Sequence, residues 1–344
     1  MIGLLGFAAL FLLARFRPGS GAGWLALIWW GLLVFIHSPL IAQPNAIAWI
    51  LGGDLRAWLL FGLIGAVALI YRFGLSRLRR VARPVVESGP GPAFSDVELE
   101  RYARHIMLRE IGGPGQKRLK EARVLVVGAG GLGSPALLYL AAAGVGHIGV
   151  IDADRVENSN LQRQVIHRDQ SINQFKAVSA ATAMAAINPF IEIRPYTHLL
   201  DEDNQALIAE YDLVLDGTDN FDTRYGVNRW AVAAGKPLIS AAITQWEGQI
   251  GLYDPARGGP CFECIFPEPP APGLVPSCAE AGVAGPLPGV IGSMMALEAV
   301  KAITGAGQGL RGRLMIYDGL YGETRMIMVK RRVDCPICRT LPSS

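Results

Sequence analysis

The sequence predicts an α/β protein with a doubly wound, mainly parallel, Rossmann-like sheet, preceded by N-terminal transmembrane helices. Short apolar runs alternate with helical patterns after about residue 95, a glycine-rich turn follows the first of these runs, and long apolar segments fill the first 72 residues. We therefore divide the 344-residue chain into a transmembrane region over 1–72, a basic segment and linker over 73–94, and a domain over 95–344.

Three apolar segments make up most of the front of the chain: Met1–Ala14, Trp24–Ile36 and Ala57–Tyr71. Each is close to, or slightly shorter than, the ~20 residues that cross a bilayer, so three spans are expected, with two as the alternative. A signal peptide is disfavoured because no positive charge precedes the first segment. Buried helices are disfavoured because nothing nearby is amphipathic enough to cover them.

Arginines set the expected orientation, since they favour the cytoplasmic side. They follow the first and third apolar segments, at Arg15, Arg17, Arg72, Arg77, Arg79, Arg80 and Arg83. We expect a multi-pass protein of the inner membrane with its N-terminus outside and its catalytic domain in the cytoplasm. The first 90 residues carry a net charge of +6, which leaves −3 for the rest of a chain of net charge +3. No nucleic-acid partner is therefore expected.

The remainder alternates between apolar strand runs and helical patterns. We expect strands over 123–129, 147–154, 191–197, 212–218 and 237–243, and helices over 95–106, 134–144, 174–188, 202–211 and 221–235. In such a sheet, ligands bind at the carboxyl ends of the strands.

The stretch "RVLVVGAGGLGSPALLYLAAAG" joins the first strand to a helix through Gly128, Gly130, Gly131 and Gly133. Glycines at this point allow a tight turn and let backbone N–H groups and a helix N-terminus approach a phosphate. Asp152 ends the next strand, where a carboxylate usually accepts the hydroxyls of a ribose. These features suit NAD as well as ATP, and alone they favour a dehydrogenase.

Charged residues downstream favour a triphosphate. A dinucleotide is usually satisfied by backbone N–H groups, whereas a departing pyrophosphate needs fixed cations and a metal. Arg163 and Lys176 are suited to be those cations, and "DLVLDGTDN" places Asp219 at the same sheet edge, where it could hold Mg²⁺.

At this point the sequence resembles the MoeB/ThiF/HesA family, the bacterial relatives of ubiquitin-activating enzymes, and most closely its molybdopterin-synthase adenylyltransferases. The resemblance covers Arg101–Cys338 and leaves the apolar front outside it. Its motifs are "RYARHIMLREIGGPGQKRL", "VGAGGLGSPALLYLAAAGVG", "NSNLQRQVIH", "LVLDGTDNFDTRYGVN", "EGQIGLYDP", "CFECIFPEPP", "PSCAEAGVAGPLPGVIGSMMALEAVK" and "CPIC".

The resemblance implies a role for each matching position. Asp219 binds Mg²⁺, with Asn220 beside it, and Arg104 reaches into the site of a neighbouring subunit, which implies a homodimer. Phe175 stands where the family often has proline, so a local change is expected where that helix begins. The residues expected against ATP are Gly131, Asp152, Asn160, Arg163 and Lys176.

Two Cys-x-x-Cys pairs, Cys261 with Cys264 and Cys335 with Cys338, could each offer two thiolates to tetrahedral Zn²⁺. Their separation of about 70 residues exceeds that of compact zinc motifs, so a redox dithiol is the alternative. The resemblance implies a structural zinc site. Cys278, alone in a Pro/Gly-rich run, matches an acceptor thiol of some relatives and is equally consistent with a cysteine that has no chemical role.

The expected reaction is adenylation of the C-terminal glycine of a small ubiquitin-like sulfur-carrier protein by Mg·ATP. The carrier expected first is the small subunit of molybdopterin synthase, in molybdenum-cofactor biosynthesis. The thiamine-pathway carrier, an NAD-dependent oxidoreductase and a membrane-tethered scaffold without turnover are the alternatives. Sulfur is expected from a separate sulfurtransferase, and His105, His167 and His198 are expected to be structural.

Overall fold

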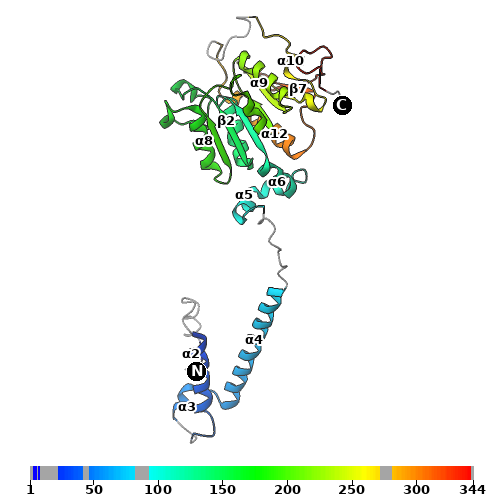
Figure 1. The fold of residues 1–344 in the computed structure, drawn as a ribbon. Coiled ribbons are helices and arrows are strands. Elements are labelled where there is room, and N and C mark those ends of the chain that lie inside the picture. Colours follow the sequence, from blue (N-terminus) through cyan, green and yellow to red (C-terminus); the bar gives the residue numbers. More distant parts are fainter. Residues whose placement is uncertain are drawn as a thin grey trace. The chain divides into compact units, whose positions relative to one another are not determined.

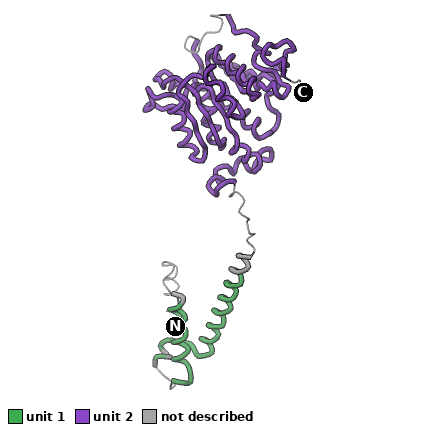
Figure 2. Tube along the Cα trace, viewed as in Figure 1, with its two compact units in different colours: residues 1–91 green, residues 92–344 purple. Residues whose placement is uncertain are grey.

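The computed structural model describes residues 3–5, 7, 22–41, 46–81, 93–271 and 281–341. It divides the chain into two compact units, a front unit (Met1–Gly91) and a domain (Pro92–Ser344), which Figure 2 shows in separate colours. The first predicted span, Met1–Ala14, and the predicted linker, Arg83–Phe94, lie almost wholly outside the described residues.

The front unit contains the helices α2 (Ala22–Ile36), α3 (Ala46–Leu51) and α4 (Leu55–Val81). Helices α2 and α4 pack together through tryptophans, because Trp30 Nε1 donates to the carbonyl of Trp58 at 2.8 Å and Trp58 is itself buried. Gly62 makes room for this contact, since a β-carbon there would lie 2.3 Å from the ring of Trp30.

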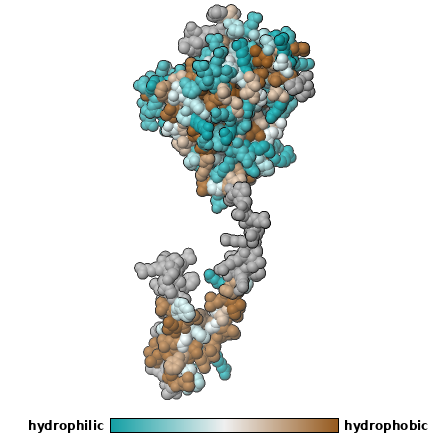
Figure 3. All heavy atoms as spheres, viewed as in Figure 1, coloured by the Kyte–Doolittle hydropathy of each residue, from teal (hydrophilic) through white to brown (hydrophobic). Residues whose placement is uncertain are grey.

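Large apolar side chains lie on the outside of the front unit, and its described surface is mainly hydrophobic in the view of Figure 3. By length and composition alone, two helices of the described chain could cross a membrane. They are Leu55–Leu75 within α4, of which 6% is buried, and Pro286–Thr304, of which 56% is buried.

The domain begins with two helices and continues as a sheet with helices on both faces (Figure 1). Its strands are β1 (Arg123–Val127), β2 (His147–Ile151), β3 (Glu192–Tyr196), β4 (Leu213–Asp216), β5 (Leu238–Thr244), β6 (Glu247–Tyr253), β7 (Arg313–Asp318) and β8 (Glu323–Met328). Its helices are α5 (Asp96–Ile106), α6 (Gly112–Glu121), α7 (Gly133–Ala143), α8 (Lys176–Ile187), α9 (Phe221–Ala233), α10 (Phe262–Ile265) and α12 (Pro286–Thr304). Its 3₁₀ turns are η1 (Asn158–Asn160), η2 (Asp169–Ser171), η3 (Gln205–Glu210) and η4 (Pro255–Arg257).

The eight strands form one sheet in the order β3-β2-β1-β4-β5-β6-β7-β8. The five strands from β3 to β5 are parallel, and β6, β7 and β8 continue the sheet in antiparallel pairs. The expected mainly parallel, doubly wound sheet is therefore confirmed. The chain leaves β1 for β2 on one side and later returns to β4 on the other, so a switch point lies where β1 and β4 end.

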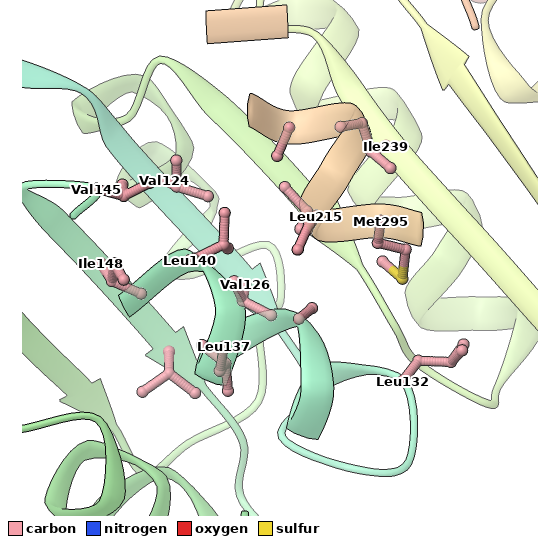
Figure 4. Packing of buried hydrophobic residues seen from close by; sticks show 14 of the residues in the cluster. Val124, Val126, Leu132, Leu137, Leu140, Val145, Ile148, Leu215, Ile239 and Met295 are labelled. Atoms are coloured by element: carbon pink, nitrogen blue, oxygen red, sulfur yellow. The ribbon is translucent and has the colours of Figure 1, made fainter. Parts of the chain in front are cut away.

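The core occupies both faces of the sheet, as strands buried on two sides require. Val124 and Val126 of β1 point toward α7 and α12, while Leu125 and Val127 join the cluster on the α9 face. Figure 4 shows the first cluster, in which Leu137 and Leu140 of α7 and Met295 of α12 pack over the strands.

The structure differs from the expected elements in several places. The helix expected over 202–211 is wrong, because only the 3₁₀ turn η3 forms there; the side chains of Asp201 and Asn204 bond the local backbone in competition with a helix. Helix α5 begins after Ser95, which caps it. Helix α8 begins after Phe175, whose ring lies 4.0 Å from the guanidinium carbon of Arg155.

Candidate functional site

The glycine turn lies at the carboxyl end of β1 and leads directly into α7. Gly128 adopts a φ of +93°, which favours glycine, and its N–H donates to the carbonyl of Ile151 at 2.9 Å. A β-carbon at Gly133 would lie 1.9 Å from the carbonyl oxygen of Gly128, so only glycine fits there. The turn thus brings backbone N–H groups and the N-terminus of α7 to the switch point, where an anion can bind.

Asp152 lies against this turn. Its Oδ2 accepts from the N–H of Ala129 at 2.7 Å and its Oδ1 from the N–H of Asp154 at 2.9 Å. Burial raises the pKa of this carboxyl, and the two backbone donors partly oppose that effect. The sequence placed this carboxylate beside the turn correctly, and its contact with a ribose remains a prediction.

His167 forms hydrogen bonds that hold the turn in place. Its Nε2 lies 2.9 Å from the carbonyl of Ala129 and its Nδ1 2.9 Å from the hydroxyl of Ser179. Burial lowers the pKa of His167, so the ring is neutral and donates from Nε2 to the turn while accepting from Ser179. A structural role for this histidine agrees with the expectation.

The two predicted cations both lie near the turn. Lys176 is almost fully buried as the first residue of α8, and its Nζ donates to Asp154 Oδ2 at 2.7 Å. Its charge partly opposes the rise that burial causes in the pKa of Asp152. The Cγ of Arg163 lies 3.8 Å from where a β-carbon of Gly131 would be. Both cations are therefore within reach of an anion bound at the turn.

Two amide side chains lie beside Arg163. Asn160 is buried, and its Oδ1 accepts from the N–H of Glu157, so its amide nitrogen is the group left to donate. The sequence analysis missed Gln164, which is 4% exposed and whose Nε2 lies 3.7 Å from the position of a Gly130 β-carbon. Its Oε1 has no hydrogen-bond partner among the described residues, which suits a ligand-facing group. The only signal in the sequence was its position next to Arg163.

Asp219 is exposed in the loop that joins β4 to α9. This loop meets the glycine turn, because a β-carbon at Gly128 would lie 3.4 Å from backbone atoms of Gly217 and 3.6 Å from Cγ2 of Thr218. Asn220 caps α9, its Oδ1 accepting from the N–H of Thr223 at 2.7 Å. The structure thus brings Asp219 to the same edge as the turn, with Asn220 in a helix-capping position.

Arg104 is the predicted residue that the single chain does not bring to this edge. It lies exposed on α5, which packs where the strands begin: the hydroxyl of Tyr102 accepts from Asn188, the residue that ends α8 before β3. The five residues of β1 alone separate the two edges by about 17 Å. A role for Arg104 at an ATP site therefore requires a second copy of the chain.

The four paired cysteines come together in a separate, fully described cluster. The Sγ atom of Cys261 lies 3.7 Å from that of Cys264 and 3.6 Å from that of Cys335. The Sγ atoms of Cys264 and Cys338 are 3.4 Å apart. Zinc with ~2.3 Å bonds to four thiolates places sulfurs about 3.8 Å apart, so the cluster fits zinc. All four are buried, and hydrogen bonding from Cys261 lowers the pKa of Cys264. Cys278 lies outside the described residues.

Comparisons with known proteins agree with this arrangement. The model of the ThiF family matches residues 102–337. The sulfur carrier protein adenylyltransferase of Thermus thermophilus is 48% identical over 251 residues, which are 72% of this chain and 93% of that protein. The probable adenylyltransferase/sulfurtransferase MoeZ of Mycobacterium tuberculosis is 50% identical over 257 residues, which are 74% of this chain and 65% of MoeZ.

The mouse adenylyltransferase and sulfurtransferase MOCS3 is 46% identical, and the match spans 55% of its length. Among solved structures, E. coli MccB with ATP has the same fold, with a TM-score of 0.60 and 24% identity over 72% of this chain and 76% of MccB. From the match over most of its domain and these identities, the chain belongs to the ThiF family.

Proposed function

We propose that the chain is an adenylyltransferase that uses ATP and Mg²⁺ to activate the C-terminal glycine of a small ubiquitin-like sulfur-carrier protein. The observation that supports this proposal is that Lys176, Arg163 and the loop that carries Asp219 all lie at the edge of the sheet where the glycine turn leads into α7. Relatives named adenylyltransferases support the chemistry.

The reaction needs little acid–base help from the protein. A carboxylate oxygen of the carrier attacks the α-phosphorus of ATP, the bond to the β-phosphate oxygen breaks, and pyrophosphate leaves with the negative charge. Because a carboxylate is already a nucleophile at neutral pH, catalysis consists of positioning and charge neutralisation. That requirement explains a site made of cations and one metal-binding carboxylate.

The chain's own residues can supply each part. The backbone N–H groups of the glycine turn and the N-terminus of α7 would face the phosphates, and Asp152, which accepts from the N–H of Ala129 in that turn, would face the ribose. Arg163 and Lys176 neutralise the phosphate oxygens, with Lys176 held in place by Asp154. Asp219 would hold Mg²⁺, which neutralises charge on the phosphates.

The carrier we propose first is the small subunit of molybdopterin synthase, and the thiamine-pathway carrier is the second candidate. Names of relatives such as MoeZ and MOCS3 support a sulfur-transfer setting for the reaction. A separate sulfurtransferase is proposed as a further partner, since the Thermus relative, spanned over 93% of its length, is named for adenylation alone.

Exchange of labelled pyrophosphate into ATP tests this function. The purified full-length chain is incubated in detergent with Mg²⁺, ATP and each carrier in turn. We expect exchange with the molybdopterin-synthase subunit that disappears when its C-terminal glycine is removed. Exchange with the thiamine-pathway carrier alone would change the assigned substrate, and exchange with neither would contradict the proposed function.

We also propose that the front unit holds the protein in the inner membrane, with the domain in the cytoplasm. The apolar 21-residue segment of α4, almost entirely exposed, supports this proposal. Protease treatment of inside-out vesicles should remove the domain, whereas vesicles of the opposite orientation should protect it.

The position of Arg104 at the far edge of the sheet supports a homodimer in which each copy completes the site of the other. Mixing an Arg104→Ala chain with an Asp219→Ala chain should restore part of the activity that each variant loses alone. Equal inactivity of the mixed and separate variants would contradict a shared site.

A further inference from the structure

Asp219 follows Thr218 in the loop that joins β4 to α9. Because neither strand nor helix fixes this loop, the orientation of Asp219 depends on how Thr218 is held. The N–H and hydroxyl of Thr218 donate to Asp216 Oδ1 at 3.0 and 2.6 Å. The carbonyl of Thr218 accepts from Nη2 of Arg224. Thr218 is thus held at both of its backbone ends, directly before Asp219.

The two groups that hold Thr218 form a buried charged pair. Asp216 is fully buried and Arg224 almost so, with Arg224 Nε 3.4 Å from Asp216 Oδ2. Asp216 Oδ2 also accepts from Ser240 at 2.7 Å, and Arg224 Nη2 also donates to the carbonyl of Ala241 at 2.9 Å. Burying two charges is costly and breaking such a pair is more so, which makes its geometry resistant to change.

The ring of Phe262 connects this pair to the cysteine cluster. Phe262 lies between Cys261 and Cys264 in the sequence, and its ring centroid is 6.0 Å from the guanidinium carbon of Arg224. Two further rings pack edge-on against it, Tyr225 at 5.4 Å and Tyr253 at 5.5 Å. The ring is therefore fixed from several sides. Phe262 also lies in the same Cys-x-x-Cys as two cysteines of the cluster, Cys261 and Cys264.

We propose that the cysteine cluster helps to aim Asp219, through Phe262, Arg224 and Thr218. In this inference, which rests on the proposed function, Arg224 and Phe262 are positioning residues. The four-cysteine cluster and the Asp219 carboxylate, which would bind magnesium, are thus structurally coupled.

The proposal predicts a change in magnesium dependence. A misoriented Asp219 carboxylate should raise the Mg²⁺ concentration that half-saturates pyrophosphate exchange. At saturating Mg²⁺ the rate of exchange should return to the wild-type level. A purely structural role would lower the folded fraction and leave the half-saturating concentration unchanged. Electron paramagnetic resonance of Mn²⁺, with a non-hydrolysable ATP analogue bound, measures the same affinity without turnover.

Phe262→Leu tests the connection, with Phe266→Leu as its matched control, both in the full-length chain in detergent. Phe266 is the neighbouring ring, 4.8 Å from Phe262, and α10 ends just before it. Both variants keep all four cysteines, so zinc content should stay at the wild-type level. We expect about a threefold rise in the half-saturating Mg²⁺ and Mn²⁺ concentrations for Phe262→Leu only. Wild-type values for Phe262→Leu would overturn the connection.

Arg224→Lys tests the next step, because lysine keeps the positive charge but has one nitrogen in place of the guanidinium, which approaches Asp216 through Nε and donates to the carbonyls of Thr218 and Ala241 through Nη2. Loss of a group that orients a metal ligand typically costs about tenfold or more in metal affinity. Where this variant fails to fold, Thr218→Val removes the hydroxyl bond to Asp216, and Thr218→Ser should restore wild-type metal affinity. Unchanged metal affinity in a folded Arg224→Lys or Thr218→Val chain would overturn the proposal.

The two proposals can fail separately. Wild-type exchange with unshifted variants would refute the coupling and leave the adenylyltransferase intact. Absence of wild-type exchange with either carrier, together with a shifted Mn²⁺ affinity in Phe262→Leu, would refute the substrate and support the coupling. A wild-type chain that binds no Mn²⁺ with the ATP analogue would overturn both.

Discussion

Helices α4 and α12 have a similar apolar character and opposite surroundings. Each contains an apolar segment long enough to cross a bilayer, 21 residues in α4 with a mean hydropathy of 1.9 and 19 residues in α12 with 1.3. Most of the α4 segment is exposed, as at Leu63, whereas α12 packs against α7, β5 and β6, with Met295 fully buried. Apolar length therefore does not distinguish a membrane helix from a core helix, and the covering elements do.

The contrast between the two helices extends to the two units that contain them, which differ in the residues that they carry. The domain that contains α12 holds the turn, the cations, Asp219 and the cysteine cluster, whereas the front unit holds an apolar outer surface. Chemistry should therefore respond to changes in the domain, and membrane retention to changes in the front unit.

The largest effect on activity is expected from a change at Asp219 in the domain. Asp219→Ala should lower pyrophosphate exchange by about 10²-fold or more, because the carboxylate that holds Mg²⁺ is lost. Since Asp219 is exposed, the thermal midpoint should stay close to that of the wild type. Asp222→Ala, which removes an exposed acid from the first turn of α9, is the control and should keep exchange. Exchange by Asp219→Ala within twofold of the wild type would contradict a metal-binding role for Asp219, whereas biological activity that survives this change would favour the scaffold alternative.

Cys335→Ala should abolish zinc binding and destabilise the domain, since three thiolates leave a tetrahedral site incomplete. Metal analysis should find about one zinc per wild-type chain and clearly less in the variant. Cys278→Ser changes a cysteine outside the cluster and should retain the metal. A normal zinc content in Cys335→Ala would be incompatible with the four-cysteine site.

A matched pair of truncations compares the two helices directly. Met295→Ala in α12 should destabilise the domain by about 2–5 kcal/mol, because it leaves a cavity in the core. Leu63→Ala in α4, at a position 62% exposed, should change domain stability by less than about 0.5 kcal/mol. Urea unfolding followed by domain fluorescence measures both. Similar losses in the two variants would remove the distinction between the helices.

Acidification should loosen the glycine turn through His167. Burial lowers its folded-state pKa below the ordinary 6.5, so the neutral ring stabilises the fold above that pH. This contribution is lost as the pH falls from about 6.5 through the lowered pKa. His167→Gln should therefore show a smaller drop in thermal midpoint between pH 7 and pH 5 than the wild type. His198→Gln, at an exposed position, should match the wild type.

The smallest effect on chemistry is expected from removal of the front unit. A chain without residues 1–84 should leave the membrane fraction and keep its rate of exchange within about twofold, because every predicted site residue lies at or after Arg104. Loss of exchange in a truncated chain that remains folded would show that the front unit does more than attach the domain.

Much of the site could be predicted because its residues follow successive strands. Parallel strands end at one edge, so Asp152 and Asp219 had to meet the glycine turn wherever the sheet formed. Gln164 could not be predicted, since its burial depends on how the segment after β2 folds back over the turn. Asp216 and Arg224 were missed for a similar reason: the sequence shows two acids in "DGTDN", but only packing decides which is buried and paired.

The sequence by itself determined the five parallel strands, the edge that carries the glycine turn and the pairing of cysteines within each Cys-x-x-Cys, because periodicity, glycine placement and short spacing are local properties of a chain. The tertiary structure decided which apolar helix is covered, that Arg104 lies at the edge opposite the turn, and that two cysteine pairs about 70 residues apart share one cluster. Those outcomes depend on contacts between distant segments, and the free energy of such contacts is set by the whole fold.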